Sequence, residues 1–345
     1  MGQQGFWDLE QRQQELAAKK STLEDLDRLI PWESFRAQLA VIHDKPRKSN
    51  AGRKPMDVIL MFKLLVLQQL YNISDEALEY QVKDRLSFMR FLGLGIEDSV
   101  PDATTVWLFR QQLQAHQLVE PLFESFGEYL SAQGYQAQGG QIIDATLIPV
   151  PKQHFDQDEK AHLEAGKRPP QWQENPHQGA QKDGDATWTK KNGKSYFGYK
   201  DHLSIDANHG FIRRYAVTDA AVHDSQAFTA VLDADNEGDE VWADSAYRSV
   251  ALEGLLVVLT FISHIHERAY RNRPLSEEQK AANRERSQTR AKVEHVFGAW
   301  VMQMGGKLVR SIGLERAKVQ LGLKNLTYNF LRLVFWQTRP VEADG

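Results

Sequence analysis

The chain changes character at Gly139-Gly140. Before this pair, apolar residues recur at helical spacing, and after it Gln141–Val150 has the apolar, β-branched composition of a buried strand. The shift predicts a helical domain over residues 1–135 and a domain that mixes helices and strands over residues 136–345. A length of 345 residues is enough to give each domain a core.

Composition excludes several classes of protein. The chain has no cysteine, so disulfides and thiolate metal sites are ruled out. Its N-terminus is polar and acidic, which argues against a signal peptide, and its apolar stretches are too short to span a bilayer. We therefore expect a cytoplasmic protein with no membrane association. The formal net charge of -4 does not by itself suggest a nucleic-acid partner.

Residues 45–54 form a basic run that the net charge conceals. The run holds five Lys and Arg residues and no acidic residue, and its Pro and Gly disfavour packing. A solvated linker explains such a run as well as a DNA contact does. As a basic linker that contacts DNA, it would act through Arg47, Lys48, Arg53 and Lys54.

Helices are predicted directly after this run, over residues 56–70, 75–91 and 104–114. Ser74 is a suitable N-cap for the second of them. Short helices joined by tight turns behind a basic arm are typical of a helix-turn-helix DNA-binding domain. Taken alone, such helices are more often plain packing units.

The segment over residues 151–193 is long and polar, with few aliphatic side chains. We expect an exposed loop inserted after the first strand, without a core of its own. Its three histidines, His154, His162 and His177, have no regular ligand spacing, so solvated histidines are favoured over a metal site.

Strand and helix signals then alternate to the end of the chain. Residues 195–205 and 211–217 form a predicted hairpin around a turn at Asn208–Gly210. Further strands are expected over 241–243 and 256–265, with helices over 224–232, 246–255, 276–302 and 316–336. A hairpin followed by alternating helices and strands predicts an α/β fold, a ribonuclease H-like mixed sheet with flanking helices, preceded by the all-α N-terminal domain.

Three acidic residues stand in different local settings within this layout. Asp144 lies in the middle of the apolar first strand, Asp244 at the end of the 241–243 strand, and Glu294 inside the long helix. Each alone is more often a salt bridge, a helix cap or a solvated helix-face acid. Together they could hold two Mg²⁺ ions roughly 4 Å apart, with Asp144 bridging, for attack on a phosphodiester.

Five ordered motifs carry a resemblance that covers most of the chain. They are Ile143–Pro151, Phe197–His202, Val217–Ser225, Trp242–Arg248 and Arg290–Gly298. In these motifs the chain resembles the DDE transposases of bacterial insertion sequences, in the insertion-sequence-five group. Its N-terminal half, with Gly52–Pro55 and Pro101–Arg110, is similar to the DNA-binding domain of that group.

The resemblance implies a metal-dependent DNA transposase with Asp144, Asp244 and Glu294 as catalytic and metal-binding residues. Such an enzyme binds double-stranded terminal inverted repeats, cuts the 3′ ends and joins them to target DNA. It implies two Mg²⁺ ions, for which Mn²⁺ can substitute, and a homodimer in a synaptic complex with DNA. Two alternatives stay open, a ribonuclease H-like nuclease without strand transfer and a catalytically silent DNA-binding regulator.

The third motif acid departs from the broader family pattern in its neighbours. Relatives often carry an aromatic and a basic residue around Arg290 and Glu294, but the aromatic position here is Ser287. The basic position falls near Trp300 and Val301, and Lys307 or Arg310 could replace it. Arg290 lies one helical turn before Glu294, so both can face the same phosphate.

Other residues are candidates for DNA contact. Lys200 and His202 share one face of the second strand and could approach the metal site from there. Tyr247 and Arg248 directly follow Asp244, although Tyr247 could equally be a core residue.

The stretch over residues 268–292 holds eight Lys and Arg against three Glu. A solvated helix face is the plain explanation, and a phosphate track beside the metal site is the functional one. The candidate phosphate contacts in the track are Arg271, Arg273, Arg284 and Arg286, and Arg290 beside Glu294 is a further candidate for DNA contact.

Overall fold

The computed structural model describes residues 14, 15, 19, 21–44, 55–191, 193–270 and 273–339. These residues divide into two compact units, one of which combines the described residues up to Ser125 with those from Leu326 onward. The other unit is Phe126–Asn325. The basic run over 45–54, with Arg47, Lys48, Arg53 and Lys54, lies outside the described residues, as does Arg271. Within the described ranges, no helix is long and apolar enough to cross a membrane.

The first unit is helical, so the expected N-terminal helical region is confirmed. Its helices and 3-10 turns are α2 (Thr22–Leu29), η1 (Trp32–Phe35), α3 (Arg36–Ala40), η2 (Val41–His43), α4 (Val58–Tyr71), α5 (Asp75–Asp84), α6 (Leu86–Leu92) and α7 (Ala103–Ala115). Two more helices, α8 (Val119–Ala132) and α15 (Leu314–Thr338), contribute residues to both units.

Helix α4 forms the centre of this unit because it is apolar on almost every side and contacts α3, α5, α6 and α7. Ser74 caps α5 as predicted, its hydroxyl accepting from the Ala77 N–H at 3.2 Å. The Arg110 guanidinium forms two hydrogen bonds to the Asp75 carboxylate, at 2.7 and 2.8 Å, and so fixes α7 against α5. The helix-turn-helix character of these helices stays a prediction.

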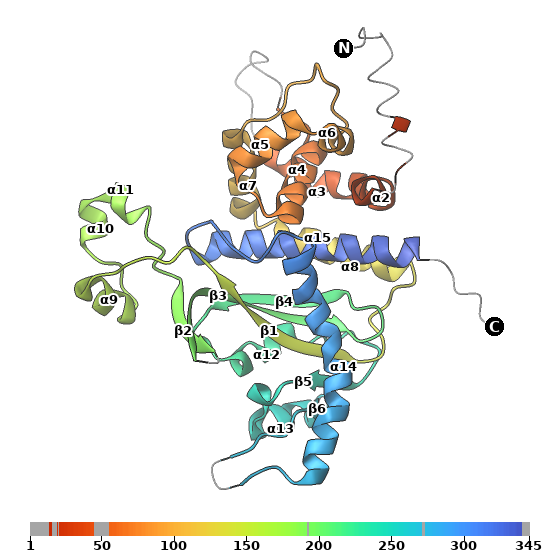
Figure 1. Ribbon diagram of the computed structural model, residues 1–345, viewed down its shortest axis with the longest axis vertical. Helices are drawn as coiled ribbons and strands as arrows, with labels where there is room; N and C mark the ends of the chain where they lie inside the picture. Colours follow the sequence, from red (N-terminus) through yellow and green to blue (C-terminus); the bar gives the residue numbers. More distant parts are fainter. Residues whose placement is uncertain are drawn as a thin grey trace, which may run out of the picture. The chain divides into compact units, whose positions relative to one another are not determined.

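A six-stranded sheet organises the second unit (Figure 1). Its strands are β1 (Gln141–Pro149), β2 (Thr187–Lys191), β3 (Lys194–Asp206), β4 (Ile212–Asp219), β5 (Glu240–Ala243) and β6 (Ile262–Ile265). β3 pairs antiparallel with β1, β2 and β4, whereas β5 pairs parallel with β1 and β6. An antiparallel half joined to a parallel half through β1 confirms the expected ribonuclease H-like mixed sheet.

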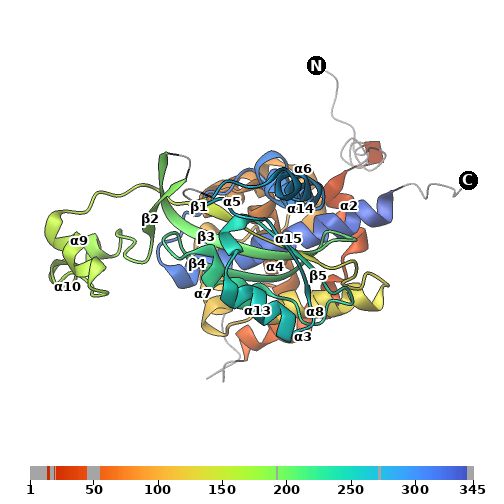
Figure 2. The same cartoon turned by 90° about the horizontal axis from the view of Figure 1, so that it is seen from below.

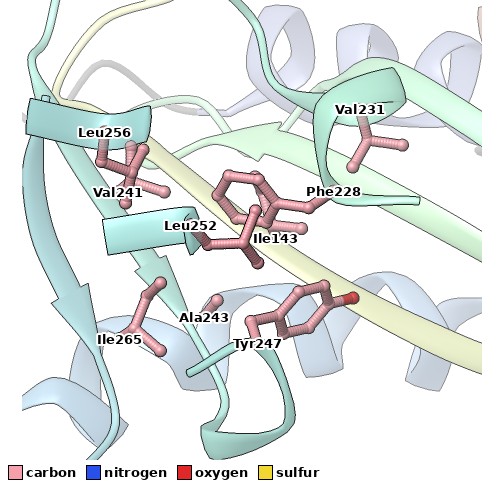
Figure 3. Close-up of a cluster of buried hydrophobic side chains, with 9 residues drawn as sticks. All are labelled: Ile143, Phe228, Val231, Val241, Ala243, Tyr247, Leu252, Leu256 and Ile265. Atoms are coloured by element: carbon pink, nitrogen blue, oxygen red, sulfur yellow. The ribbon is translucent and has the colours of Figure 1, made fainter. Parts of the chain in front are cut away.

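Helices cover both faces of this sheet. α12 (Phe228–Val231) and α13 (Val250–Val258) cover one face, and α14 (Glu277–Met302) contacts β1 and β5. Figure 2 shows α14 and α13 on opposite sides of the strands. Under α12 and α13 lies an apolar cluster, gathered in Figure 3, of Ile143, Phe228, Val231, Val241, Ala243, Tyr247, Leu252, Leu256 and Ile265.

The predicted strand over 256–265 is wrong in its first half. α13 continues to Val258, and only Ile262–Ile265 forms a strand. The helix persists because Leu252 and Leu256, four residues apart, enter the core on the same helix face, and the Ser249 hydroxyl caps its start. The apolar run therefore spans a helix end and an edge strand instead of one buried strand.

The insertion over 151–193 also differs from the expected loop. It contains α9 (Gln157–Glu164), α10 (Gln171–Glu174), α11 (Pro176–Gly179) and β2. Phe155 and Trp172 are buried together, and the Trp172 indole donates to the buried Glu159 carboxylate at 2.7 Å. Two aromatic rings and one satisfied carboxylate thus give the segment a small core that its polar composition concealed.

Candidate active site

The parallel pairing of β1 with β5 brings Asp144 beside Asp244. The last paired residues are Ile143 and Ala243, so an acid follows at the same level on each strand. Since neighbouring strands lie roughly 4.8 Å apart, the two carboxylates are neighbours. Ile143 and Ala243 point into the apolar cluster, and the residue after each of them points to the opposite face.

Each of these two acids is anchored by a backbone N–H group. Asp244 is the N-cap of η4 (Ser245–Tyr247), and its Oδ1 accepts from the Ala246 N–H at 2.8 Å. Asp144 Oδ1 accepts from the Ala145 N–H at 2.8 Å. Both side chains are therefore held by backbone N–H groups that follow them closely in the chain.

Helix α14 supplies the third acid, Glu294, and an arginine that binds Asp144. The Arg290 guanidinium donates from Nη2 to Asp144 Oδ2 at 2.9 Å. Burial by itself would lower the pKa of Arg290, but the charges of Asp144, Asp244 and Glu294 together raise it. All three predicted acids therefore act on one guanidinium.

The environment of Asp144 makes its negative charge costly. Burial raises the pKa of Asp144, the nearby Asp244 charge adds to the rise, and Arg290 opposes it. A carboxylate in such a place is stabilised by positive charge, whether from a guanidinium or from a metal ion.

The donor set fits a hard divalent cation. Three carboxylates offer only oxygen ligands, which Mg²⁺ and Mn²⁺ prefer. Within the described residues, no three His, Asp or Glu side chains stand close enough to form a ready-made metal site. The Arg290 guanidinium holds Asp144 Oδ2 in this arrangement.

Lys200 and His202 lie on the opposite face of the sheet, contrary to expectation. Antiparallel pairing aligns Asp144 with Leu203, so the even-numbered residues of β3 point away from the Asp144 side. The Lys200 ammonium forms an ion pair with Asp224 at 2.8 Å. His202 is fully buried, with its Nε2 2.9 Å from Thr218 Oγ1, and burial lowers its pKa to about 4.

Tyr247 and Arg248 are likewise engaged inside the protein. Tyr247 has no exposed surface and belongs to the apolar cluster, which contradicts a direct DNA contact (Figure 3). Arg248 bridges Glu253 and Glu267 at 3.2 and 3.0 Å and donates to the Ile265 carbonyl. Its guanidinium therefore holds α13 and β6 together.

Only part of the predicted phosphate track is exposed and could contact DNA. Arg273 and Arg284 are exposed. Arg286 donates to the Ile265 carbonyl at 2.9 Å, and Arg290 binds Asp144. Two of the three described members of the track are thus exposed, whereas Arg286, like Arg290, has a partner within the protein.

A threonine and a lysine complete the Asp144 side of the sheet. Thr146 follows Asp144 at strand spacing, and its hydroxyl accepts from Lys307 Nζ at 2.7 Å. Burial and the charge of Lys191 lower the pKa of Lys307 to about 8, against the attraction of Asp144 and Asp201. Because side chains alternate along a strand, the sequence alone would have placed Thr146 on the same face as Asp144. It suggested Lys307 only as one of two replacements for the basic residue missing after Glu294.

Asp201 is a further acid on this side that sequence reasoning passed over. It pairs with Thr146 across the strands, is fully buried, and accepts from Asn325 Nδ2 at 3.0 Å. Burial raises its pKa to about 8, so it is largely protonated near neutral pH.

A ribonuclease H-like sheet, with acids side by side on adjacent parallel strands and a third on the covering helix, is typical of the class of polynucleotidyl transferases and nucleases. Comparison with known families narrows this class. A family model described as a transposase DDE domain matches residues 135–330, and the chain belongs to this family of DNA transposases. A second model, described as a transposase domain, matches residues 10–112.

A solved structure is also similar. It is the cryo-EM structure of a piggyBac transposase synaptic complex with hairpin DNA, at a TM-score of 0.48 and 13% sequence identity. The match covers 93% of this chain and 76% of that chain.

Proposed function

We propose that this transposase binds the terminal inverted repeats of a mobile element, cleaves their 3′ ends and joins the 3′-hydroxyls to target DNA. The observation that carries the proposal is the placing of Asp144 and Asp244 side by side on adjacent parallel strands, with Arg290 of α14 bound to Asp144, inside a DDE domain. The motifs Trp242–Arg248 and Arg290–Gly298 support the insertion-sequence-five group as its closer affiliation.

The three acids would hold two divalent ions, Mg²⁺ or Mn²⁺. When bound, such ions activate the attacking hydroxyl and take up charge on the leaving oxygen. The chain's own residues supply the frame: backbone N–H groups fix Asp144 and Asp244, and α14 presents Glu294. Arg290 balances the acidic charge and is placed to take a non-bridging phosphate oxygen.

Lys307 supplies the basic contact that the sequence lacks directly after Glu294. Its ammonium lies on the Asp144 side of the sheet, hydrogen-bonded to Thr146. An ammonium in this position can bind the phosphate next to the cleaved bond.

The helical unit is the proposed reader of the terminal repeats, as the match of residues 10–112 to a transposase domain supports. The two DNA ends of an element must be handled together, so the working form is proposed to be a homodimer on DNA. The basic run over residues 45–54 would contact the phosphate backbone.

An end-joining assay tests the proposal. The purified chain is mixed with Mg²⁺, a supercoiled target and duplexes carrying the inverted repeats that flank its gene. Nicks with joined products identify a transposase, nicks alone a nuclease, and binding without cleavage a silent regulator. The last two outcomes overturn strand transfer.

Three substitutions test the assignment of the acids. Asp144→Asn, Asp244→Asn and Glu294→Gln each remove charge without changing shape, and each is expected to lower cleavage by at least about 10³-fold while DNA binding stays. Glu285→Gln is the matched control, because Glu285 is an exposed acid on the same helix. A fully active Asp144→Asn protein would contradict the mechanism.

A further inference from the structure

A two-stranded ribbon, formed by β2 and the start of β3, carries concentrated positive charge. Lys190, Lys191 and Lys194 are exposed at its tip, and the sequence from Ala186 to Phe197 contains no acidic residue. Within the described part of the chain, none of the three lysines has an ion-pair partner. The whole chain has a formal net charge of -4, so this local excess is not a reflection of average composition.

The pairing at the tip is unfavourable without an external anion. Lys191 and Lys194 are directly opposite each other across the two strands. Like charges directly opposite each other destabilise a sheet. Lysines placed there therefore indicate a partner that supplies negative charge.

The ribbon extends beyond the strand that carries the active site. β1 pairs with β3 only as far as Gly198, so the tip has no third strand beside it. Figure 2 shows β2 and the start of β3 projecting beyond β1. Trp188 on this ribbon is 47% exposed, and the Lys152 ammonium lies 6.0 Å from its ring.

Positive charge continues from this tip to the catalytic acids. The segment that carries Lys307 lies beside the start of the ribbon, because the Val309 N–H donates at 3.1 Å to the carbonyl of Pro149, which pairs with Gly198 of β3. Lys307 donates to Thr146, two residues from Asp144. A DNA backbone lying along these ammonium groups would be led to the candidate active site.

We propose that this ribbon binds the phosphate backbone of duplex DNA without sequence preference and guides it toward Asp144. The inference rests on the proposed transposase function, which supplies the DNA substrate. A two-stranded ribbon also has the width that fits a major groove. Lysine contacts to phosphate carry no base information, which suits DNA of arbitrary sequence.

Edge protection is the competing explanation. Lysines on an exposed edge strand also prevent pairing with other chains. That role would leave DNA affinity unchanged when the lysines are neutralised, and it would make the neutralised protein prone to aggregate. The two explanations therefore give opposite binding results.

The salt dependence of binding to a random-sequence duplex, in EDTA so that no cleavage occurs, provides the first test. Lys190→Gln/Lys191→Gln/Lys194→Gln is expected to reduce the slope of log affinity against log salt by about 2–3, since each phosphate contact contributes about 0.9. The charge-matched control Lys160→Gln/Lys167→Gln/Lys318→Gln changes exposed lysines outside the ribbon and should change the slope less. Thermal unfolding checks that both variants are folded. An unchanged slope in the folded ribbon variant overturns the proposal.

The absence of cysteine allows a second, positional test. Lys194→Cys creates the only thiol in the chain, to which an iron chelate that cuts nearby DNA can be attached. Cuts close to the joining site are expected, and Lys160→Cys should give none there. Cuts from neither position, or equal cuts from both, contradict the ribbon contact. Because the binding test needs no catalysis, a failed end-joining assay would overturn the proposed function and leave this result standing.

Discussion

Two consecutive residues of β1, Ile143 and Asp144, lie on opposite faces of the sheet in entirely different surroundings. Ile143 has no exposed surface and packs among Phe228, Leu252 and Leu256. Asp144 points the other way, into a cluster of charges around Arg290. The fold depends on the first face and the proposed chemistry on the second, and strand alternation keeps them apart.

The same separation continues along β3. Lys200 and His202 face the side of α12, where Lys200 forms an ion pair with Asp224. Asp201 faces the Asp144 side and is paired with Thr146. Where β3 pairs with β1, a charged residue on β3 therefore lies on the Asp144 side if its number is odd and on the α12 side if its number is even.

Substitutions of the two consecutive residues Ile143 and Asp144 should show the largest difference between the two faces of β1. Ile143→Ala is expected to lower the free energy of unfolding by about 2–5 kcal/mol through lost burial and a cavity, with Ile143→Val as a graded control at about 0.5–1.5. Asp144→Asn should change it by less than about 1 kcal/mol, because burial already makes the charge costly, yet abolish strand joining. Urea denaturation without metal measures both. A larger loss of stability in Asp144→Asn would mean that the two faces are not functionally distinct.

Lys200→Met tests whether the buried side of β3 is only structural. Loss of the ammonium leaves Asp224 without its ion pair, so unfolding free energy should fall by about 1–3 kcal/mol. DNA affinity and its salt dependence should stay unchanged. The double variant Lys200→Met/Asp224→Asn should lose less than the two single losses combined. A weaker DNA affinity at unchanged stability would instead support the sequence-based assignment of Lys200 to DNA binding.

Asp201→Asn tests the Asp144 side of the sheet through the pH dependence of the free energy of unfolding. Burial raises the folded pKa of Asp201 to about 8, far above the usual value of 3.8, so the folded state binds a proton that the unfolded state releases. Stability from this group is present below pH 4 and is lost as pH rises toward 8, at up to about 1.4 kcal/mol per pH unit. The isosteric Asn keeps an oxygen for Asn325, so the variant should gain relative to wild type over this window. Lys307, whose charge opposes the rise in the pKa of Asp201, has a pKa of about 8, at the top of this window. Parallel stability profiles from pH 4.5 to 7.5 would contradict the shift.

Much of the sheet was predictable because its signals are local. The alternating residues of β3 and β4 and the apolar run of β1 each predicted a strand that the structure confirms. β2 was missed although Asn192-Gly193, a strong hairpin-turn signal, follows it directly. The polar composition around it favoured a loop, and Trp172 and Phe155 alone did not indicate a core.

The candidate site was only partly predictable, because the face on which a β3 side chain lies depends on the register in which β3 pairs with β1. Asp144, Asp244 and Glu294 could be named from sequence, since each stands out from its own surroundings. The faces of Lys200 and His202 follow only from the pairing of Asp144 with Leu203, which no local signal specifies. Lys307 reaches the site from a segment far along the chain, so only the fold brings it to Thr146.

Two arginines on α14 give the prediction with the smallest expected effects, and it separates a DNA contact from a structural contact. Arg284 is exposed, whereas Arg286 donates to the Ile265 carbonyl at 2.9 Å. Arg284→Gln should leave stability within about 0.5 kcal/mol and reduce the salt slope of DNA binding by about 1. Arg286→Gln, two residues away, should lower stability by about 1 kcal/mol through the lost hydrogen bond, with a smaller effect on the slope. If Arg284→Gln leaves the slope unchanged, DNA does not run along this part of α14, and the ribbon and Lys307 would remain as the proposed path to Asp144.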